Sequence, residues 1–281
     1  MNFKRDTAIL FVPDGLPDEQ ALTRTTHMGI SAHQDDLETM AAEPILKCFQ
    51  QNDKWFTGVV VTDGRGSPRD DLYKDYSDEE MRLVRFKEQK KAAVIGEYAA
   101  QIILDYPSKI VKDGSTRQPV EDLAMLMQIA QPEFVYTHNL ADKHDTHVAV
   151  ALRVIEAIRS LPKDARPQRL YGCEVWRDLD WMIDADKVAF DVSAHENLQA
   201  ALLGVFDSQI CGGKRYDLAT MGRRRAHTTF FASHETDKAT GLIFAMDLTP
   251  LVVDPNRDVL AFAQELIQHF AQEVATRIGA M

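Results

Sequence analysis

Two short polar segments of the chain carry side chains that can bind a metal ion and activate water. The first contains His33, Asp35 and Asp36 directly after an apolar run, and the second contains His144 and His147, three residues apart. In the first segment, a His and an Asp at this spacing can converge on one cation, which leaves the Asp between them free to act as a base. Each segment alone also fits a polar turn that caps a helix. The two segments therefore gain meaning only if the fold brings them together.

The pattern around these segments predicts strands alternating with helices. Short apolar runs rich in β-forming residues alternate with longer runs of helical period, which is typical of βαβ units around a parallel sheet. Capping boxes are expected at 77–80 and again at 193–196. The expected strands are 28–32, 56–62, 100–105, 134–138 and 170–176, and the main expected helices are 77–96, 119–130, 146–161 and 257–278. We predict one α/β domain over residues 27–281, preceded by an N-terminal arm of residues 1–26.

The order of the strands decides whether the two polar segments meet. If the first three strands wind outward and the chain then returns, the fourth strand lies beside the first, in the order 3-2-1-4. Such sheets bind ligands in the crevice at the carboxyl ends of these two neighbouring strands. Both polar segments follow those strand ends. We therefore expect them to face each other across this crevice.

Two His and one Asp would leave a metal ion with an open coordination position, the arrangement of catalytic zinc. We assign His33, Asp36 and His147 as the ligands, although Fe(II) or another divalent ion also accepts this set. Asp35 is expected to take a proton from a water activated by the ion, and His144 to face the developing oxyanion or the leaving group. The residues thus predict metal-dependent hydrolysis of a polarised carbonyl.

Both segments resemble motifs of the PIG-L/LmbE-like family of zinc-dependent N-deacetylases. Residues 32–36 are similar to the family's Ala-His-Pro-Asp-Asp, with Gln34 in place of Pro, and residues 144–147 are similar to its His-Pro-Asp-His, with the middle pair changed. Residues 59–64 match the Val-Thr-x-Gly pattern of the second strand, and residues 85–88 match an Arg-x-x-Glu on the following helix. The resemblance covers roughly residues 27–160.

This resemblance implies a Rossmann-like, mainly parallel sheet flanked by helices, with C-terminal additions that shape the pocket. It implies a hydrolase that removes an N-acetyl group from an N-acetylglucosamine-type sugar or sugar conjugate. The residues that match the family's zinc ligands are His33, Asp36 and His147, and the residue that matches its base is Asp35. Another metal-dependent amide or ester hydrolase, and a non-catalytic module that binds small molecules, are the alternatives.

Several other side chains are candidates for substrate contacts. Arg65 lies in a glycine-containing loop that leaves a strand end toward the same crevice, so it is a candidate for binding sugar hydroxyls or an anionic aglycone; a solvated turn is the alternative. The family match makes Arg85 a second candidate, against an ordinary ion pair within its helix. The run 223–225 is either a solvated helix face or a clamp for a phosphate or carboxylate. Trp176 and Trp181 would either stack on a sugar or pack in the core.

The overall composition narrows the class of partner. The chain has 281 residues, 32 Lys and Arg against 43 Asp and Glu, and a net charge of −11. This balance disfavours nucleic acids and anionic lipid surfaces as partners. The 3 cysteines give no disulfide framework, and no apolar run approaches the ~18 residues of a membrane span. We expect a cytoplasmic protein that acts on a small molecule, with homo-oligomer formation left open.

Overall fold

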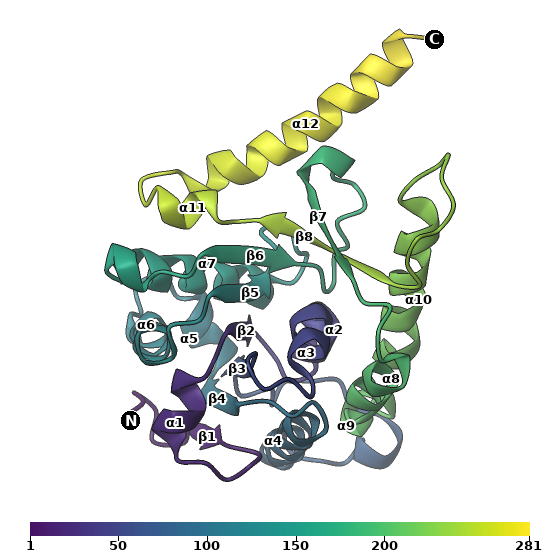
Figure 1. Ribbon diagram of the computed structural model, residues 1–281. Coiled ribbons are helices and arrows are strands. Elements are labelled where there is room, and N and C mark those ends of the chain that lie inside the picture. Colours follow the sequence, from purple (N-terminus) through teal and green to yellow (C-terminus); the bar gives the residue numbers. More distant parts are fainter.

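Five parallel strands form the centre of an eight-stranded sheet in the computed structural model, which describes residues 1–281 (Figure 1). The sheet order is β1-β4-β3-β2-β5-β6-β8-β7. The parallel strands are β2 (His27–Ser31), β3 (Phe56–Thr62), β4 (Ala100–Tyr106), β5 (Phe134–His138) and β6 (Arg169–Cys173). The antiparallel strands are β1 (Ile9–Phe11) at one edge, β7 (Lys187–Asp191) at the other edge, and β8 (Leu242–Asp247) between β6 and β7. Because β5 lies beside β2, the predicted return of the chain and the mainly parallel α/β fold are confirmed.

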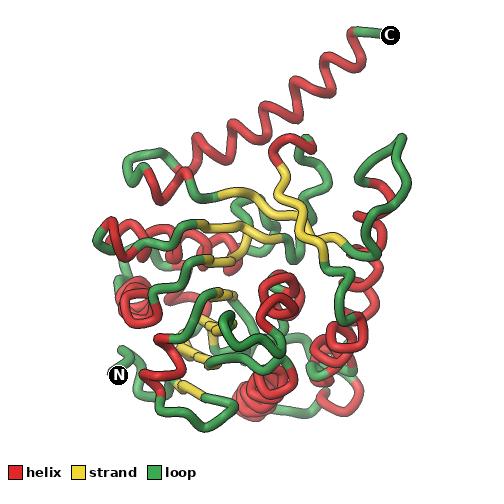
Figure 2. Tube along the Cα trace, in the orientation of Figure 1, coloured by secondary structure: helices red, strands yellow, loops and turns green.

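Helices cover both faces of this sheet (Figure 2). Alternate side chains of β3 show the two sides, since Val59 and Val61 belong to one hydrophobic cluster and Val60 to the other. One side carries α1 (Asp18–Thr23), α5 (Ser108–Lys112), α6 (Gln118–Ala130), α7 (Asp145–Ser160) and α11 (Pro250–Val253). The other side carries α2 (Asp36–Met40), α3 (Ala42–Cys48), α4 (Asp78–Ile95), α8 (Glu196–Gly204), α9 (Asp207–Ile210) and α10 (Tyr216–Phe230). Short 3-10 turns are at Asp71–Tyr73, Lys163–Ala165 and Asp184–Asp186.

The two expected capping boxes have different outcomes. At the start of α4 the Ser77 side chain accepts the Glu80 N–H, and the Glu80 carboxylate accepts the Ser77 N–H, as predicted. The prediction of a second capping box at 193–196 is wrong. There the Ser193 hydroxyl donates to Asp191 at the end of β7, and α8 follows His195, which has a φ of +51° and forms no side-chain cap. The nearby acid thus takes the Ser193 hydroxyl away from the helix.

Both ends of the chain contribute secondary structure. Residues 1–26, expected as an arm, carry β1, which pairs with β4, and α1, which buries Ala21 and Leu22. At the other end, α12 (Val259–Gly279) extends away from the sheet (Figure 1) and buries only Phe262 and Leu266. None of the helices combines the length and apolar character that crossing a membrane requires. The site is therefore built from the elements between these two ends.

Candidate metal centre

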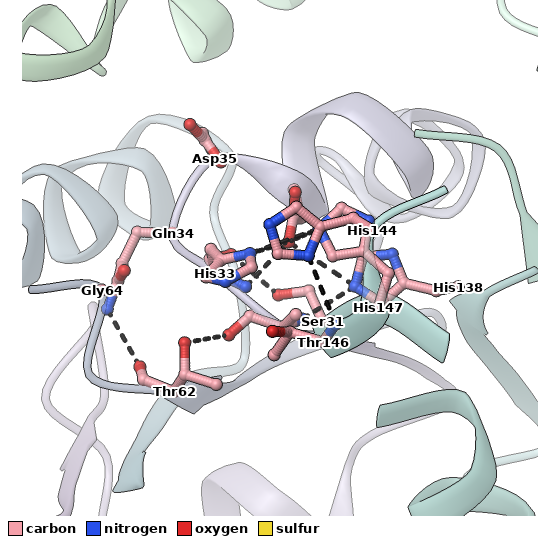
Figure 3. A network of polar contacts seen from close by, with 12 residues as sticks. Ser31, His33, Gln34, Asp35, Thr62, Gly64, His138, His144, Thr146 and His147 are labelled. Carbon is pink, nitrogen blue, oxygen red and sulfur yellow. Dashed lines mark hydrogen bonds and ion pairs between the residues drawn. The ribbon is translucent and has the colours of Figure 1, made fainter. Parts of the chain in front are cut away.

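The two polar segments meet at the carboxyl ends of β2 and β5, as the predicted topology requires. The turn with His33 and Asp36 joins β2 to α2, and the loop with His144 joins β5 to α7, whose first turn carries His147. Because β2 and β5 are parallel neighbours, their carboxyl ends lie together. Figure 3 shows the imidazoles of both segments gathered in one group.

The donor atoms of the three predicted ligands lie close to one another. His33 Nδ1 is 3.2 Å from Asp36 Oδ2 and 3.2 Å from His147 Nε2, and these last two atoms are 3.4 Å apart. Bonds of about 2.0–2.1 Å to a tetrahedral zinc ion would separate such atoms by about 3.3 Å. Burial lowers the pKa of His33 to about 4, which keeps this imidazole neutral at neutral pH, as a ligand must be. The set fits zinc or a similar divalent ion.

A fourth imidazole, His138, lies next to these atoms but belongs to the fold. Its Nε2 is 3.5 Å from Asp36 Oδ2, yet the same nitrogen accepts the backbone N–H of Ala32 at 2.8 Å. Its ring stacks on that of His147, with centroids 3.9 Å apart. Because the backbone N–H occupies the Nε2 lone pair, we place His138 outside the ligand set. Its contacts arise from strand pairing, so no local spacing in the sequence indicates them.

Asp142 connects the ligand His147 to the rest of the site. Asp142 Oδ2 lies 3.4 Å from His147 Nδ1 and accepts the Trp176 N–H at 3.1 Å, while Oδ1 accepts the His144 N–H at 3.0 Å. Burial alone would raise the pKa of Asp142, but the neighbouring His147 imidazole outweighs it and lowers the pKa. Asp142 was not among the residues predicted for the site. The available signal was an acid two residues before His144, a spacing typical of an Asx turn.

Asp35 stands apart from the ligands on the turn into α2. Its φ of +90° is in the left-handed region, which costs an L-residue of this kind about 1 kcal/mol or more. The conformation is held by Gln89 Oε1, which accepts the Asp35 N–H at 3.3 Å, and by Arg85 Nη2, 3.4 Å from the carboxylate. Burial raises the pKa of Asp35 well above its usual range. Figure 3 shows the side chain turned away from the imidazoles, as expected for a base that is not a ligand.

His144 lies next to the predicted ligands, with one of its ring nitrogens within 4.8 Å of a nitrogen of His33 and of His147. Its Nδ1 accepts the Thr146 N–H at 3.3 Å, which caps α7. The neutral ring therefore carries its proton on Nε2, an assignment that follows from the hydrogen bond. The ring also stacks on His147, with centroids 4.5 Å apart, and burial lowers its pKa. His144 can thus donate a hydrogen bond from Nε2.

These residues open into a cavity of about 730 Å³. Among its lining residues are His33, Asp35, Asp36, Asp63, Gly64, Arg85, Lys112, His144, Trp176, Lys214, Arg215, Tyr216 and Arg223. Arg65 is not brought to the cavity. Its Nε donates to Asp63 Oδ2 at 2.8 Å, and its Nη1 lies 3.5 Å from Glu79 Oε2, so the geometry gives it an ion-pairing role. Trp176 lines the cavity, whereas Trp181 packs against the core and Phe270.

The part of the chain that carries the site matches a known protein family. Residues 28–158 match the model of the PIG-L family, described as GlcNAc-PI de-N-acetylase. This part of the chain is a PIG-L family domain. The PIG-L domain contains both polar segments of the predicted metal site, so the resemblance found in the sequence is confirmed. The wall of the cavity formed by Trp176 and α10 lies beyond the matched residues.

Solved structures share the fold of the PIG-L domain and its C-terminal part. The 4-carboxy-2-hydroxymuconate hydratase GalB of Pseudomonas putida KT2440 is 15% identical, with a TM-score of 0.59 over 80% of this chain and 96% of that chain. The N,N'-diacetylchitobiose deacetylase of Pyrococcus horikoshii is 16% identical, with a TM-score of 0.59 over 78% and 83%. The zinc-inhibited form of the teicoplanin deacetylase Orf2 is 13% identical, with a TM-score of 0.55 over 79% and 97%. A comparison with curated proteins finds no match. At these identities the likeness concerns the fold alone.

Proposed function

We propose that this protein is a zinc-dependent N-deacetylase that removes an N-acetyl group from an N-acetylglucosamine-type sugar or sugar conjugate. The observation that carries the proposal is the convergence of His33, Asp36 and His147 at 3.2–3.4 Å in a cavity that is also lined by the Asp35 carboxylate, which is not part of the set. Amide hydrolysis by metal-activated water needs an open coordination position and a carboxylate that is not a ligand. The PIG-L match supports an amide as the bond that is cleaved.

The proposed mechanism divides the reaction among five side chains. His33, Asp36 and His147 would hold the metal ion, which when bound polarises the acetyl carbonyl and acidifies water. Asp35 takes a proton from the attacking water as its oxygen bonds to the carbonyl carbon. His144 donates from Nε2 to the oxyanion that develops. When the C–N bond breaks, Asp35 returns the proton to the amine nitrogen, so acetate and the free amine leave.

Arg85 acts in this mechanism as a positioning residue. It donates to the carbonyl oxygens of Gln34 and Gly64 and lies 3.4 Å from the Asp35 carboxylate. These contacts fix the turn on which the base is mounted. Arg85 would therefore act on the substrate indirectly, by orienting Asp35.

Acetate release from zinc-loaded protein tests the proposal. N-acetylglucosamine, its glycosides, simple acetate esters and 4-carboxy-2-hydroxymuconate form the substrate panel, since a hydratase shares the fold. The proposal expects acetate and free amine in equal amounts from at least one N-acetyl sugar, with activity lost on chelation and restored by zinc. Hydration of the unsaturated acid with no acetate from any sugar would contradict it, and turnover of esters alone would change the bond class.

A further inference from the structure

Cationic side chains line the cavity of a protein whose net charge is −11. The cations are Arg85, Lys112, Lys214, Arg215 and Arg223. Arg85 lies beside Asp35, and Arg215 pairs with Asp217 at 2.8 Å. The other three, Lys112, Lys214 and Arg223, line the cavity without an ion-pair partner. The cavity therefore differs in charge from the rest of the molecule.

The carboxylates of the cavity do not balance these free cations. Asp36 faces the imidazoles of the metal site, Asp63 bonds to Arg65 at 2.8 Å, and Asp35 lies 3.4 Å from Arg85. Each acid is thus committed to a positive or metal-binding partner. A cleft lined by one sign of charge concentrates ligands of the other sign.

Two of the free cations contact the segment of Val175 and Trp176, which lines the cavity near the metal site. Lys214 Nζ lies over the Trp176 ring, 5.1 Å from its centroid. Arg223 donates through Nη1 to the Val175 carbonyl oxygen, which leaves its Nε and Nη2 without a protein acceptor. The Trp176 ring in turn lies 6.1 Å from the His144 ring. The free donors are thus separated from the reacting centre by one aromatic side chain.

The three consecutive arginines of α10 have different surroundings. Arg224 is buried and donates to Gln199 Oε1 at 2.7 Å and to the Glu38 carbonyl oxygen at 2.8 Å. Arg225 is exposed and pairs with Glu196. Arg223 alone of the three lines the cavity. The clamp considered for the whole run is therefore possible at one residue, and Arg225 is a matched control.

We propose that Lys214 and Arg223 form a subsite that binds an anionic group, a phosphate or a carboxylate, on the aglycone of the N-acetylated substrate. The inference rests on the proposed function, because the acetamido group must lie at the metal site. The anomeric carbon neighbours the carbon that bears this group, so an anomeric substituent lies close enough to the metal site to reach Trp176 and the two cations beside it. A lysine ammonium and the free edge of an arginine provide charge-assisted hydrogen bonds to either anion.

The kinetic test uses three substrates that differ in this substituent. These are N-acetylglucosamine 1-phosphate, the carboxymethyl glycoside and the neutral methyl glycoside, each assayed for acetate release by zinc-loaded protein. We expect kcat/KM to be about tenfold or more higher for at least one anionic substrate, since such a contact is stronger than a neutral one. Whichever of the two anionic substrates has the higher kcat/KM shows whether the subsite prefers a phosphate or a carboxylate. The preference should shrink as salt is raised.

Variants assign the preference to the subsite. Lys214→Met and Arg223→Gln should each lower kcat/KM for the preferred anion about tenfold and leave the methyl glycoside nearly unchanged. Arg225→Gln should change neither, because its side chain points to Glu196 outside the cavity. Equal kcat/KM for all three sugars, insensitive to Lys214→Met, would overturn the subsite while the deacetylase stands.

A binding measurement separates this inference from the proposed function. Calorimetric titration of the zinc-loaded Asp35→Asn protein with the same sugars measures affinity without turnover. The subsite is supported if an anionic sugar binds more tightly than the methyl glycoside and this difference is lost in Asp35→Asn/Lys214→Met. This holds even if the wild type releases no acetate; in that case only the proposed function fails. Equal affinity for all three sugars would overturn the subsite.

Discussion

Replacing Asp35 by Asn tests the division of labour between the base and the metal ligands. Removal of a general base lowers kcat about 10²–10⁴-fold, which corresponds to about 3–5 kcal/mol of transition-state stabilisation. The structure predicts little other damage. Asn tolerates the left-handed region as well as Asp does, so the φ of +90° at this position can persist. The amide oxygen can also stay next to the Arg85 guanidinium, which lies 3.4 Å from the present carboxylate.

The assay for Asp35→Asn measures acetate release and zinc content on the same sample. We expect one zinc ion per chain, near-normal thermal unfolding and the stated loss of kcat. Asp71→Asn is the matched control, because Asp71 has a φ of +47° and is exposed outside the cavity. A variant with bound zinc and kcat within a few-fold of wild type would refute the base assignment. Loss of zinc would instead show that Asp35 belongs to the ligand set.

Three further substitutions probe the metal site and the fold around it. Asp142→Asn should weaken zinc binding about 10–100-fold in competition with a chelator, because it removes the carboxylate next to His147 Nδ1. The control Asp145→Asn changes an exposed acid and should leave zinc binding unchanged. Gly64→Ala should lower the free energy of unfolding in urea by about 1–3 kcal/mol, because φ is +66° and a Cβ would lie 2.0 Å from the buried amide oxygen of Gln34. The control Gly66→Ala, where a Cβ would meet no atom within 4 Å, should change this free energy by less than about 1 kcal/mol. Burial lowers the pKa of His27 to about 4. Below pH ~6.5 the unfolded chain therefore binds a proton at His27 and the native state does not, so the free energy of unfolding should fall between pH ~6.5 and ~4. His27→Phe should remove up to about 3 kcal/mol of this fall, and an unchanged pH dependence would contradict the assignment.

The central strands and their order followed from the sequence, whereas the sheet edges did not. Buried parallel strands such as 56–62 are continuous apolar runs, and the return of the chain to the first strand is a general preference of such folds. The edge strands β1 and β7 are only partly buried, and β8, which is buried between β6 and β7, pairs antiparallel with both. All three pair over long sequence distances, which no local pattern indicates. The second capping box was mispredicted because a neighbouring acid, Asp191, competes for the serine.

Within the site, the residues with local spacing were predicted and those with long-range partners were not. His33 and Asp36 share one turn, and strand order alone brings them to His147. His138 and Lys214 have roles that depend on strand pairing or on the return of α10 to the cavity, which no short motif encodes. For Arg65, the neighbouring Asp63 was a local sign of the ion pair that keeps it from the cavity.

The most direct test of the central claim is the anomalous scattering of a crystal of zinc-loaded protein at the zinc edge. The account predicts one peak per chain, bonded to His33 Nδ1, Asp36 Oδ2 and His147 Nε2 at about 2.0–2.2 Å, with Asp35 outside the coordination sphere. It would be contradicted by the absence of a peak at this position, or by a peak whose ligands include His138 in place of His33.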